Sequence, residues 1–321
     1  MTLLDLLNIE TGASINTLSR IISTAPRRYK VYQIPKRTGG MRTIAHPARE
    51  LKLIQRVILQ NILEKIDVSE IATAYVKGRG IAHNAKMHAR QRWILKLDFN
   101  NFFHSITPRD WDRVVRNTEL LRPYSREAEI FHNILFWGAG EKLPKCLSIG
   151  APSSPTVSNL VCARLDAWMM EHATKIGVRV TRYADDITVS GESIGKLIKF
   201  EKLLESVLAS NKGVQFSLNS KKRGIYGPGE RRMVTGIILT PDGGISIGRE
   251  RKREISALVH RYSLDISDTA TIMKTKGLLA FAFSVEPSFF ESIRKKYGEG
   301  LIHRLMRADP DTDMPIQDPD L

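Results

Sequence analysis

Two adjacent acids, Asp185 and Asp186, lie in the run Tyr-Ala-Asp-Asp-Ile-Thr-Val-Ser and could bind a cation. The surrounding residues are typical of β-strands. Side chains alternate between faces along a strand, so neighbouring acids in one extended strand cannot point the same way. The pattern therefore predicts a tight hairpin with both acids at its turn. Carboxylates at such a turn repel each other and favour a divalent cation with oxygen ligands, although a solvated turn is the simpler explanation of the pair alone.

A third acid, Asp98, ends the apolar run Trp-Ile-Leu-Lys-Leu and precedes a run rich in phenylalanine. If the three carboxylates lie at the ends of adjacent strands, they can hold two divalent ions. Two such ions clamp the attacking and leaving oxygens of a phosphoryl displacement. A helix cap or a turn acid is the alternative for Asp98, and spacing alone does not decide between them.

The charge balance of the chain favours a polyanionic partner. The 321 residues include 49 Lys and Arg against 34 Asp and Glu, a net charge of +15. Such an excess suits nucleic acid or an acidic membrane surface. No apolar run reaches the about 20 residues that span a bilayer, and the N-terminus lacks a secretory signal pattern. We therefore expect a nucleic-acid partner, no membrane partner and a cytoplasmic location. The two cysteines, Cys146 and Cys162, lack zinc-site spacing and are expected to be buried thiols.

Apolar periodicity and turn residues predict the elements that must position these acids. Residues 29–46 have the pattern of a hairpin with a Gly39-Gly40 turn, and residues 178–183 that of the strand entering the acidic hairpin. Strands are also expected within 214–240. Helical patterns occupy two short stretches before residue 25 and then 50–66, 108–135, 156–177, 193–211, 249–261 and 269–284.

Several motifs, in a fixed order, identify a family resemblance. The segments LKLDFNNFFHSI, GAPSSPTVSNL and YADD resemble the palm motifs of reverse transcriptases, and IPKRTGGMRTIAHPARELKLIQRVIL resembles their first fingers motif. Asn84-Ala-Lys-Met-His88 is similar to the NAxxH element of bacterial retron reverse transcriptases, and Val234-Thr-Gly236 to their VTG element. The ordered set is far more specific than YADD alone.

This resemblance implies an α+β, right-hand polymerase fold with fingers, an antiparallel palm sheet and a helical thumb. The domain boundaries it implies are an N-terminal helical extension at 1–28, fingers at 29–92, a palm at 93–240 with a helical insertion at about 108–137, a thumb at 241–307 and an acidic, disordered tail at 308–321.

The resemblance also assigns the catalytic residues. Asp98, Asp185 and Asp186 would bind two Mg²⁺ ions, and the backbone carbonyl of Phe99 would complete a metal shell. Phe103 occupies the position of the steric gate that favours dNTPs over ribonucleotides. A core aromatic is the alternative for Phe103.

Further residues are assigned to nucleotide binding. Lys36 or Arg37, together with Arg42, would neutralise the triphosphate, unless these cations form a solvated hairpin tip. Ala151, in the Gly-Ala-Pro loop, would pack under the incoming nucleotide. Lys222 would approach the leaving pyrophosphate, with a basic surface turn as the alternative. The chain departs from many relatives at Ile149, where a glutamine is common.

A third group is assigned to RNA binding. Asn84 and His88, four residues apart on one helix, would have a structural or RNA-contact role. The basic thumb would grip RNA phosphates through a set of cations that includes Arg251, Lys252, Arg253 and Lys276.

The function implied is that of a retron-type reverse transcriptase. It would prime from an RNA 2′-OH in a cognate structured noncoding RNA and make multicopy single-stranded DNA joined to RNA. It would serve antiphage defence with a separately encoded effector protein. Two alternatives remain open from the sequence: a group II intron-like or other bacterial reverse transcriptase, and a non-catalytic RNA-binding scaffold. The intact acids argue against the scaffold.

Overall fold

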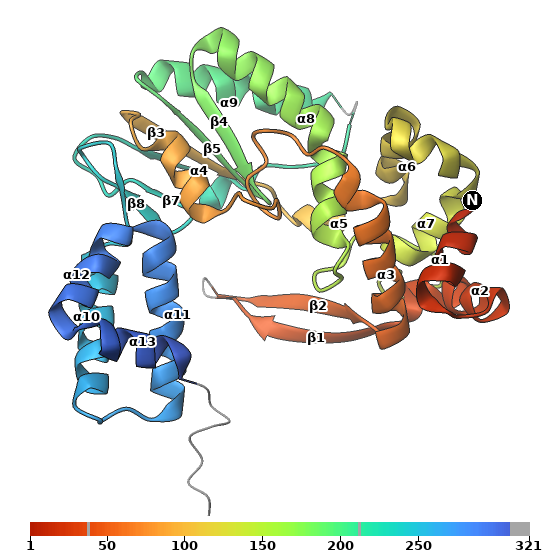
Figure 1. Cartoon of the computed structure of the whole chain (residues 1–321). Helices are drawn as coiled ribbons and strands as arrows, with labels where there is room; N and C mark the ends of the chain where they lie inside the picture. Colours follow the sequence, from red (N-terminus) through yellow and green to blue (C-terminus); the bar gives the residue numbers. More distant parts are fainter. Residues whose placement is uncertain (37–38, 211–212, 309–321) are drawn as a thin grey trace, which may run out of the picture. The chain divides into compact units, whose positions relative to one another are not determined.

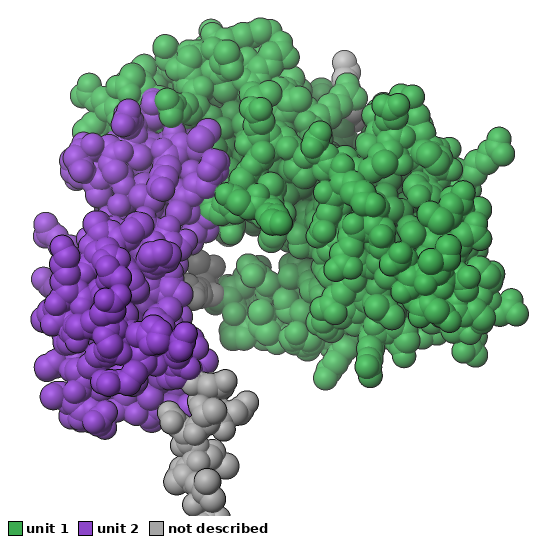
Figure 2. Space-filling view, viewed as in Figure 1, with its two compact units in different colours: residues 1–80, 92–228 green, residues 81–91, 229–321 purple. Residues whose placement is uncertain are grey.

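The computed structural model describes residues 1–36, 39–210 and 213–308, so Arg37 and the acidic tail from residue 309 lie outside the described residues. The chain divides into two compact units, each built from two stretches of sequence (Figure 2). The first comprises Met1–Gly80 with Arg92–Pro228, and the second comprises Ile81–Gln91 with Gly229–Leu321. The boundaries of fingers, palm and thumb expected from the sequence stay a prediction.

A four-stranded antiparallel sheet, in the order β4-β5-β3-β6, organises the first unit (Figure 1). Its strands are β3 (Trp93–Asp98), β4 (Arg179–Tyr183), β5 (Asp186–Gly191) and β6 (Gly224–Tyr226). The apolar side chains of Leu95, Ile187 and Val189 in the central strands β3 and β5 are fully buried. The α+β class expected from the sequence is confirmed.

Helices α8 (Ser154–Ile176) and α9 (Ile194–Ala209) contact this sheet and each other. In α9, Leu197, Phe200 and Leu204 are buried at helical spacing, so one stripe of the helix faces the core. Both helices and strand β4 between them were predicted from the sequence, with ends that differ by a few residues.

The N-terminal helices cluster together in the first unit (Figure 1). A capping box, in which Thr2 and Asp5 exchange hydrogen bonds of 2.9 and 3.1 Å, begins the first helix. These helices pack against one another through leucine and isoleucine side chains that are buried. The elements are α1 (Leu3–Thr11), α2 (Ile15–Thr24), the 3₁₀ turns η1 (Ala25–Arg27) and η2 (Leu63–Lys65), and α3 (Arg49–Asn61).

The predicted N-terminal hairpin is confirmed. Strand β1 (Tyr29–Pro35) pairs antiparallel with β2 (Met41–Pro47), and most β1 side chains are exposed. The hairpin is tied to the Gly-Ala-Pro loop because Ala45 donates a 2.9 Å backbone hydrogen bond to Ile149. At Gly150 the backbone has φ 124, and a Cβ there would lie 3.0 Å from the Ala45 carbonyl oxygen, so glycine is required for this close approach.

The helical region predicted at 108–135 is helical but interrupted. It consists of α6 (Pro108–Asn117), a 3₁₀ segment η3 (Glu119–Glu127) and α7 (Ala128–Leu135). The physical reason is Pro123, which lies inside η3 and has no backbone N–H to continue an α-helical ladder. Trp111 of α6 and Phe131 of α7 are fully buried and bring the two helices together, with ring centroids 5.5 Å apart.

The second unit joins a short sheet to a helical bundle (Figure 1). Helix α4 (Ile81–His88) packs on strands β7 (Met233–Val234), β8 (Ile237–Leu239) and β9 (Ile245–Ser246). The bundle contains α10 (Arg249–Ser263), α11 (Thr269–Val285), α12 (Pro287–Tyr297) and α13 (Glu299–Arg307). Helices α10 and α11 were predicted from the sequence. Helices α12 and α13 were not, and they are separated only by Gly298, which has φ 86.

None of the helices in the described ranges combines the length and apolar character needed to cross a membrane.

Both cysteines are buried and free, as the sequence predicts, and we expect them to resist alkylation in the native protein. Burial raises the pKa of Cys146 to about 11 and that of Cys162 to about 12. At pH 8 a thiol with a pKa near 11 is about one-thousandth thiolate, and only the thiolate reacts. Labelling with a thiol reagent should therefore be slow in buffer and complete for two thiols in denaturant. Rapid labelling of the native protein would contradict the burial.

Candidate active site

The acids Asp185 and Asp186 lie at the tip of the β4–β5 hairpin, as the sequence predicts. Tyr183 pairs with Asp186 across the two strands, which leaves Ala184 and Asp185 as the turn. Ala184 has a left-handed backbone with φ 56, which is uncommon for a residue other than glycine. The turn is closed from the neighbouring strand, because the backbone N–H of Phe99 donates a 3.0 Å hydrogen bond to the carbonyl of Asp185.

The third acid reaches the same end of the sheet through strand register. Asp98, the last residue of β3, pairs directly with Asp186, the first residue of β5. Local sequence patterns do not determine which residues pair between two strands that are far apart in the chain. The predicted convergence of the three acids at the ends of adjacent strands is therefore present in the sheet.

Lys222 supplies a positive charge to this cluster. It lies in the 3₁₀ turn η4 (Ser220–Lys222), and its Nζ donates a 2.7 Å hydrogen bond to Oδ2 of Asp98. The turn is held against β3 because the backbone N–H of Asn219 donates to the carbonyl of Asp98 at 2.8 Å. Partial burial acts to lower the pKa of Lys222, but the hydrogen bond and the charge of Asp98 outweigh it and raise the pKa.

The electrostatics of the cluster favour a bound cation. The pKa of Asp185 is raised, first by removal of its carboxyl from water and then by the charge of Asp98. The pKa of Asp186 is raised to about 7 by loss of solvation, by Asp185 and by Asp98. Repulsion among carboxylates that one lysine does not neutralise is the condition that a divalent ion with oxygen ligands relieves.

The carboxylates are close but are not gathered around one point. Within residues 1–36, 39–210 and 213–308, no three or more His, Cys, Asp or Glu side chains form a group that could hold a metal ion. The donor chemistry fits a hard cation, since all three side chains offer oxygen. The predicted metal contact of the Phe99 carbonyl stays a prediction.

Aromatic rings pack beside the acids. After β3 the chain reverses at Asn101, whose left-handed backbone has φ 48, and enters the short helix α5 (Phe102–Ser105). The half-buried ring of Phe103 lies 5.3 Å from that of Phe102 and 6.5 Å from that of Tyr75. Phe102 is buried, so of the two phenylalanines Phe103 is the more accessible.

The other predicted nucleotide-binding residues of the described ranges lie in the β1–β2 hairpin and in the Gly-Ala-Pro loop. Lys36 follows β1 and is exposed, whereas Arg42 is an exposed residue of β2. The charge of Arg42 acts to lower the pKa of Asp185, so this cation lies within electrostatic reach of the acids. Ala151 is buried in the Gly-Ala-Pro loop.

The predicted RNA-binding residues Asn84 and His88 are both buried in α4. Of the two roles expected for them, burial favours the structural one. Helix α4 packs on the strands that contain Val234-Thr-Gly236. Thr235 Oγ1 donates a 3.2 Å hydrogen bond to the carbonyl of Ile81, where α4 begins. The two retron-like elements, far apart in sequence, therefore form one packed module.

The predicted RNA-binding cations of the helical bundle differ in their contacts. Lys252 pairs with Glu286 at 2.5 Å, and Glu286 also accepts hydrogen bonds from the β9 region, so Lys252 helps to anchor α10. Arg251 lies over the ring of Phe281 at 4.9 Å, and Lys276 donates to the carbonyl of Ala308 at 3.1 Å. Arg253 is exposed.

Four residues that sequence reasoning missed lie behind the acidic turn. Arg182, which precedes Tyr183, is fully buried and forms an ion pair with the fully buried Asp166 of α8. Asn159 hydrogen-bonds to the same arginine, and Tyr75, next to Phe103, has a left-handed backbone with φ 61. The sequence contains a signal for the Arg182–Asp166 pair. An arginine in a buried strand and an aspartate on the apolar face of a helix each require a partner of opposite charge.

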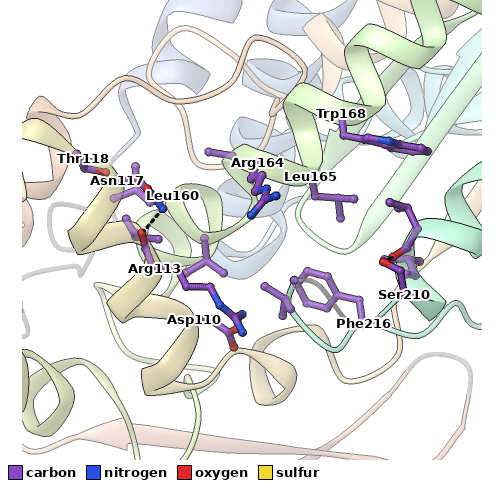
Figure 3. A pocket seen from close by; sticks show the side chains of 17 residues that line it. Asp110, Arg113, Asn117, Thr118, Leu160, Arg164, Leu165, Trp168, Ser210 and Phe216 are labelled. Carbon is purple, nitrogen blue, oxygen red and sulfur yellow. Dashed lines mark hydrogen bonds and ion pairs between the residues drawn. The ribbon is translucent and has the colours of Figure 1, made fainter.

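A cavity in the first unit is separate from the acids. Its volume is about 400 Å³, and it is lined by side chains of α6, α8 and α9, including Leu160, Leu165 and Trp168 (Figure 3). Phe216 forms part of its wall and stacks on Phe99 at 4.5 Å. The cavity therefore backs onto the residue that follows Asp98 but does not include any of the three acids.

Comparisons with known proteins agree with this geometry. Residues 34–239 match the family model described as reverse transcriptase (RNA-dependent DNA polymerase). The chain is 34% identical over 281 residues to the retron Ec83 reverse transcriptase of Escherichia coli, covering 87% of this chain and 90% of that protein. It is 33% identical over 306 residues to the retron Ec86 reverse transcriptase of the same organism, covering 92% and 90%.

A comparison with solved structures identifies the fold that the chain shares with other polymerases. The chain matches telomerase from Candida albicans, solved in complex with a fragment of telomeric RNA, with a TM-score of 0.50 and 13% identity. The match covers 83% of this chain, and the chain spans only 56% of that telomerase chain. At this identity the likeness concerns the polymerase fold alone.

Proposed function

We propose, because this chain belongs to the reverse transcriptase family and to its retron group, that it copies a cognate structured noncoding RNA into single-stranded DNA that stays joined to that RNA. RNA-directed DNA polymerase activity follows from membership of the family. The proposal goes beyond it in stating that the DNA product stays joined to the RNA. The observation that carries it is the packed module of α4 and the β7–β8 strands, which unites the two retron-like elements in a chain that keeps all three acids.

Each residue of the site has a role in this reaction. Asp98, Asp185 and Asp186 would hold two Mg²⁺ ions, which when bound supply Lewis acidity toward the primer hydroxyl and the triphosphate. Lys222 offsets the charge of Asp98 through its hydrogen bond to that carboxylate. Arg42 and Lys36 would neutralise phosphate charge from the β1–β2 hairpin. Phe103 would exclude a 2′-hydroxyl from the sugar pocket.

Priming and biological role form a second part of the proposal. A guanosine 2′-hydroxyl of the noncoding RNA would serve as primer, and the product would be multicopy DNA joined to RNA. The complex would hold a separately encoded effector in antiphage defence. The net charge of +15 supports a stable complex with RNA, since each neutralised phosphate releases a counterion.

Expression in cells tests the RNA-linked product. The chain should produce single-stranded DNA of defined length only when it is co-expressed with the structured noncoding RNA encoded beside it. A scrambled RNA of equal length is the control. If the chain made no DNA from the adjacent RNA but extended annealed DNA primers on unrelated RNA equally well, the group II intron-like alternative would replace the proposal.

If the helical bundle of the second unit binds RNA phosphates, its affinity for RNA should fall as the salt concentration rises. Arg249 and Arg253 of α10 are exposed, so replacing both by glutamine should weaken RNA binding without unfolding the bundle. Each lost phosphate contact should lower the slope of log K against log salt by about 0.7 to 0.9. Binding titrations at several salt concentrations measure this slope. Lys142→Gln, which removes one positive charge from an exposed loop of the first unit, should leave the slope unchanged. An unaltered slope in the double variant would show that Arg249 and Arg253 do not contact RNA phosphates.

A further inference from the structure

A buried polar network lies directly behind the catalytic turn. The guanidinium of Arg182 is fully buried, and it donates from Nε and Nη2 to the two carboxylate oxygens of Asp166, each at 2.7 Å. Nη2 also donates to Oδ1 of Asn159 at 3.2 Å. Bidentate pairing of this kind fixes the plane of the guanidinium as well as its position.

The remaining terminal nitrogen of the arginine points to the turn itself. Nη1 of Arg182 donates to the carbonyl oxygen of Ala184 at 3.2 Å. That carbonyl belongs to the peptide that leads into Asp185. The next peptide is held from the opposite side, because Phe99 donates to the carbonyl of Asp185 at 3.0 Å. The two peptides that flank the Cα of Asp185 are therefore both fixed by hydrogen bonds.

The same network reaches a second segment near the acids. Asn159 donates from Nδ2 to the carbonyl of Ala74 at 2.9 Å. The backbone of Arg182 itself bonds this segment, accepting from the N–H of Thr73 at 2.8 Å. The next residue after Ala74 is Tyr75, whose ring neighbours that of Phe103.

Two non-glycine residues with left-handed backbones adjoin the network. Ala184 has φ 56 and Tyr75 has φ 61. Such conformations persist where the surrounding structure holds them, and they concentrate at functional sites. Here a hydrogen bond to the Ala184 carbonyl restrains the first of these residues, and one to the Ala74 carbonyl restrains the peptide that precedes Tyr75.

We propose that Arg182, held by Asp166 and Asn159, is a positioning residue that sets the Ala184–Asp185 peptide and so aims the Asp185 carboxylate for cation binding. The inference rests on the proposed roles of the three acids. A buried ion pair contributes little to stability compared with well-packed apolar residues, so its cost is explained by the geometry it imposes on the turn. Nε and Nη2 of Arg182 donate to side-chain oxygens of Asp166 and Asn159, and Nη1 donates to the carbonyl of Ala184.

The test is Arg182→Lys, which keeps the positive charge beside Asp166 but cannot pair bidentately and reach Ala184 together. We expect the apparent affinity for Mn²⁺, followed by loss of the free-ion electron paramagnetic resonance signal, to fall about tenfold, the usual size of such an outer-shell change. The Mg²⁺ concentration for half-maximal DNA synthesis should rise by a similar factor. The KM for the RNA template should not change. Arg113→Lys, which alters another Arg–Asp pair of the first unit, should leave cation affinity unchanged.

The outcomes separate this inference from the proposed function. Wild-type protein that makes no DNA on a generic primed RNA would overturn the proposed function. An active wild type with unchanged Mn²⁺ affinity in Arg182→Lys would overturn the positioning role. If Arg182→Lys fails to fold, Asn159→Ala removes the link to Ala74 and one acceptor of Arg182 while the ion pair remains. It should lower Mn²⁺ affinity severalfold, and wild-type affinity in that variant would also count against the inference.

Discussion

Replacing Asp185 and Asp186 by asparagine is expected to lower DNA synthesis at least about a thousandfold while RNA binding stays within about twofold. Asparagine keeps the size of each side chain but removes the charges that would hold the cations. RNA binding should persist because the basic surfaces are untouched. Primer extension on RNA and a filter-binding titration measure the two quantities.

The same variant is expected to be more stable than the wild type. The raised pKa values of Asp185 and Asp186 show that their charged forms are disfavoured in the folded protein. For an acid with a raised folded-state pKa, the destabilisation is present above that pKa and disappears below the unfolded-state pKa. At pH 8 without divalent ions, thermal unfolding of the double variant should therefore occur at a higher temperature than in the wild type. The difference should shrink as the pH falls from about 7 toward 4.

The control for the Asp185→Asn, Asp186→Asn variant is Glu192→Gln, at the opposite end of the same hairpin. Glu192 follows β5 and is exposed, so its loss should change neither synthesis nor stability. DNA synthesis by the Asp185→Asn, Asp186→Asn protein at a tenth of the wild-type rate or more would exclude these acids as cation ligands. A wild type that makes no DNA would instead favour the scaffold alternative.

Replacing Phe103 by valine is the second change with a large expected effect. If the half-buried ring of Phe103 occupies the space of a 2′-hydroxyl, its removal should lower the preference for dNTPs over ribonucleotides by about 10- to 200-fold. The rate with dNTPs should fall far less. The ratio of kcat/KM for matched deoxy and ribo substrates measures the preference.

Phe102→Leu provides the matched control. Phe102 is buried, stacks on Phe216 at 5.3 Å and belongs to the core, so its shortening should lower the unfolding temperature without altering sugar selection. A change in selectivity at Phe102, or none at Phe103, would assign the gate to another side chain. Tyr75 is the first candidate, since its ring neighbours that of Phe103.

Local signals made the acidic hairpin predictable. The adjacent acids and the strand-forming residues around them leave few conformations other than a turn at Ala184 and Asp185. The aromatic segment after Asp98 and the helix α9 likewise follow from spacing alone. Each of these depends on residues that are close in sequence.

Features that depend on packing between distant segments were not predictable. The residues alone identify neither the direct cross-strand pairing of Asp98 with Asp186 nor which acid pairs with Arg182, since strand register and helix placement decide both. For Lys252, the sequence pattern suggests one role and the contacts in the fold indicate another. Its position in a basic run suggests RNA contact, but only the fold places Glu286 beside it.

The chemical nature of the RNA–DNA junction is the most direct test of RNA-primed synthesis. DNA made by this chain on its adjacent noncoding RNA should be isolated and treated with alkali, which cleaves RNA only where a 2′-hydroxyl is free. Priming from a 2′-hydroxyl predicts that a short RNA stub stays attached to the 5′ end of the DNA and is removed by an enzyme specific for 2′,5′ linkages. DNA released with a clean 5′-hydroxyl would show priming from an ordinary 3′ end and would contradict the retron mechanism.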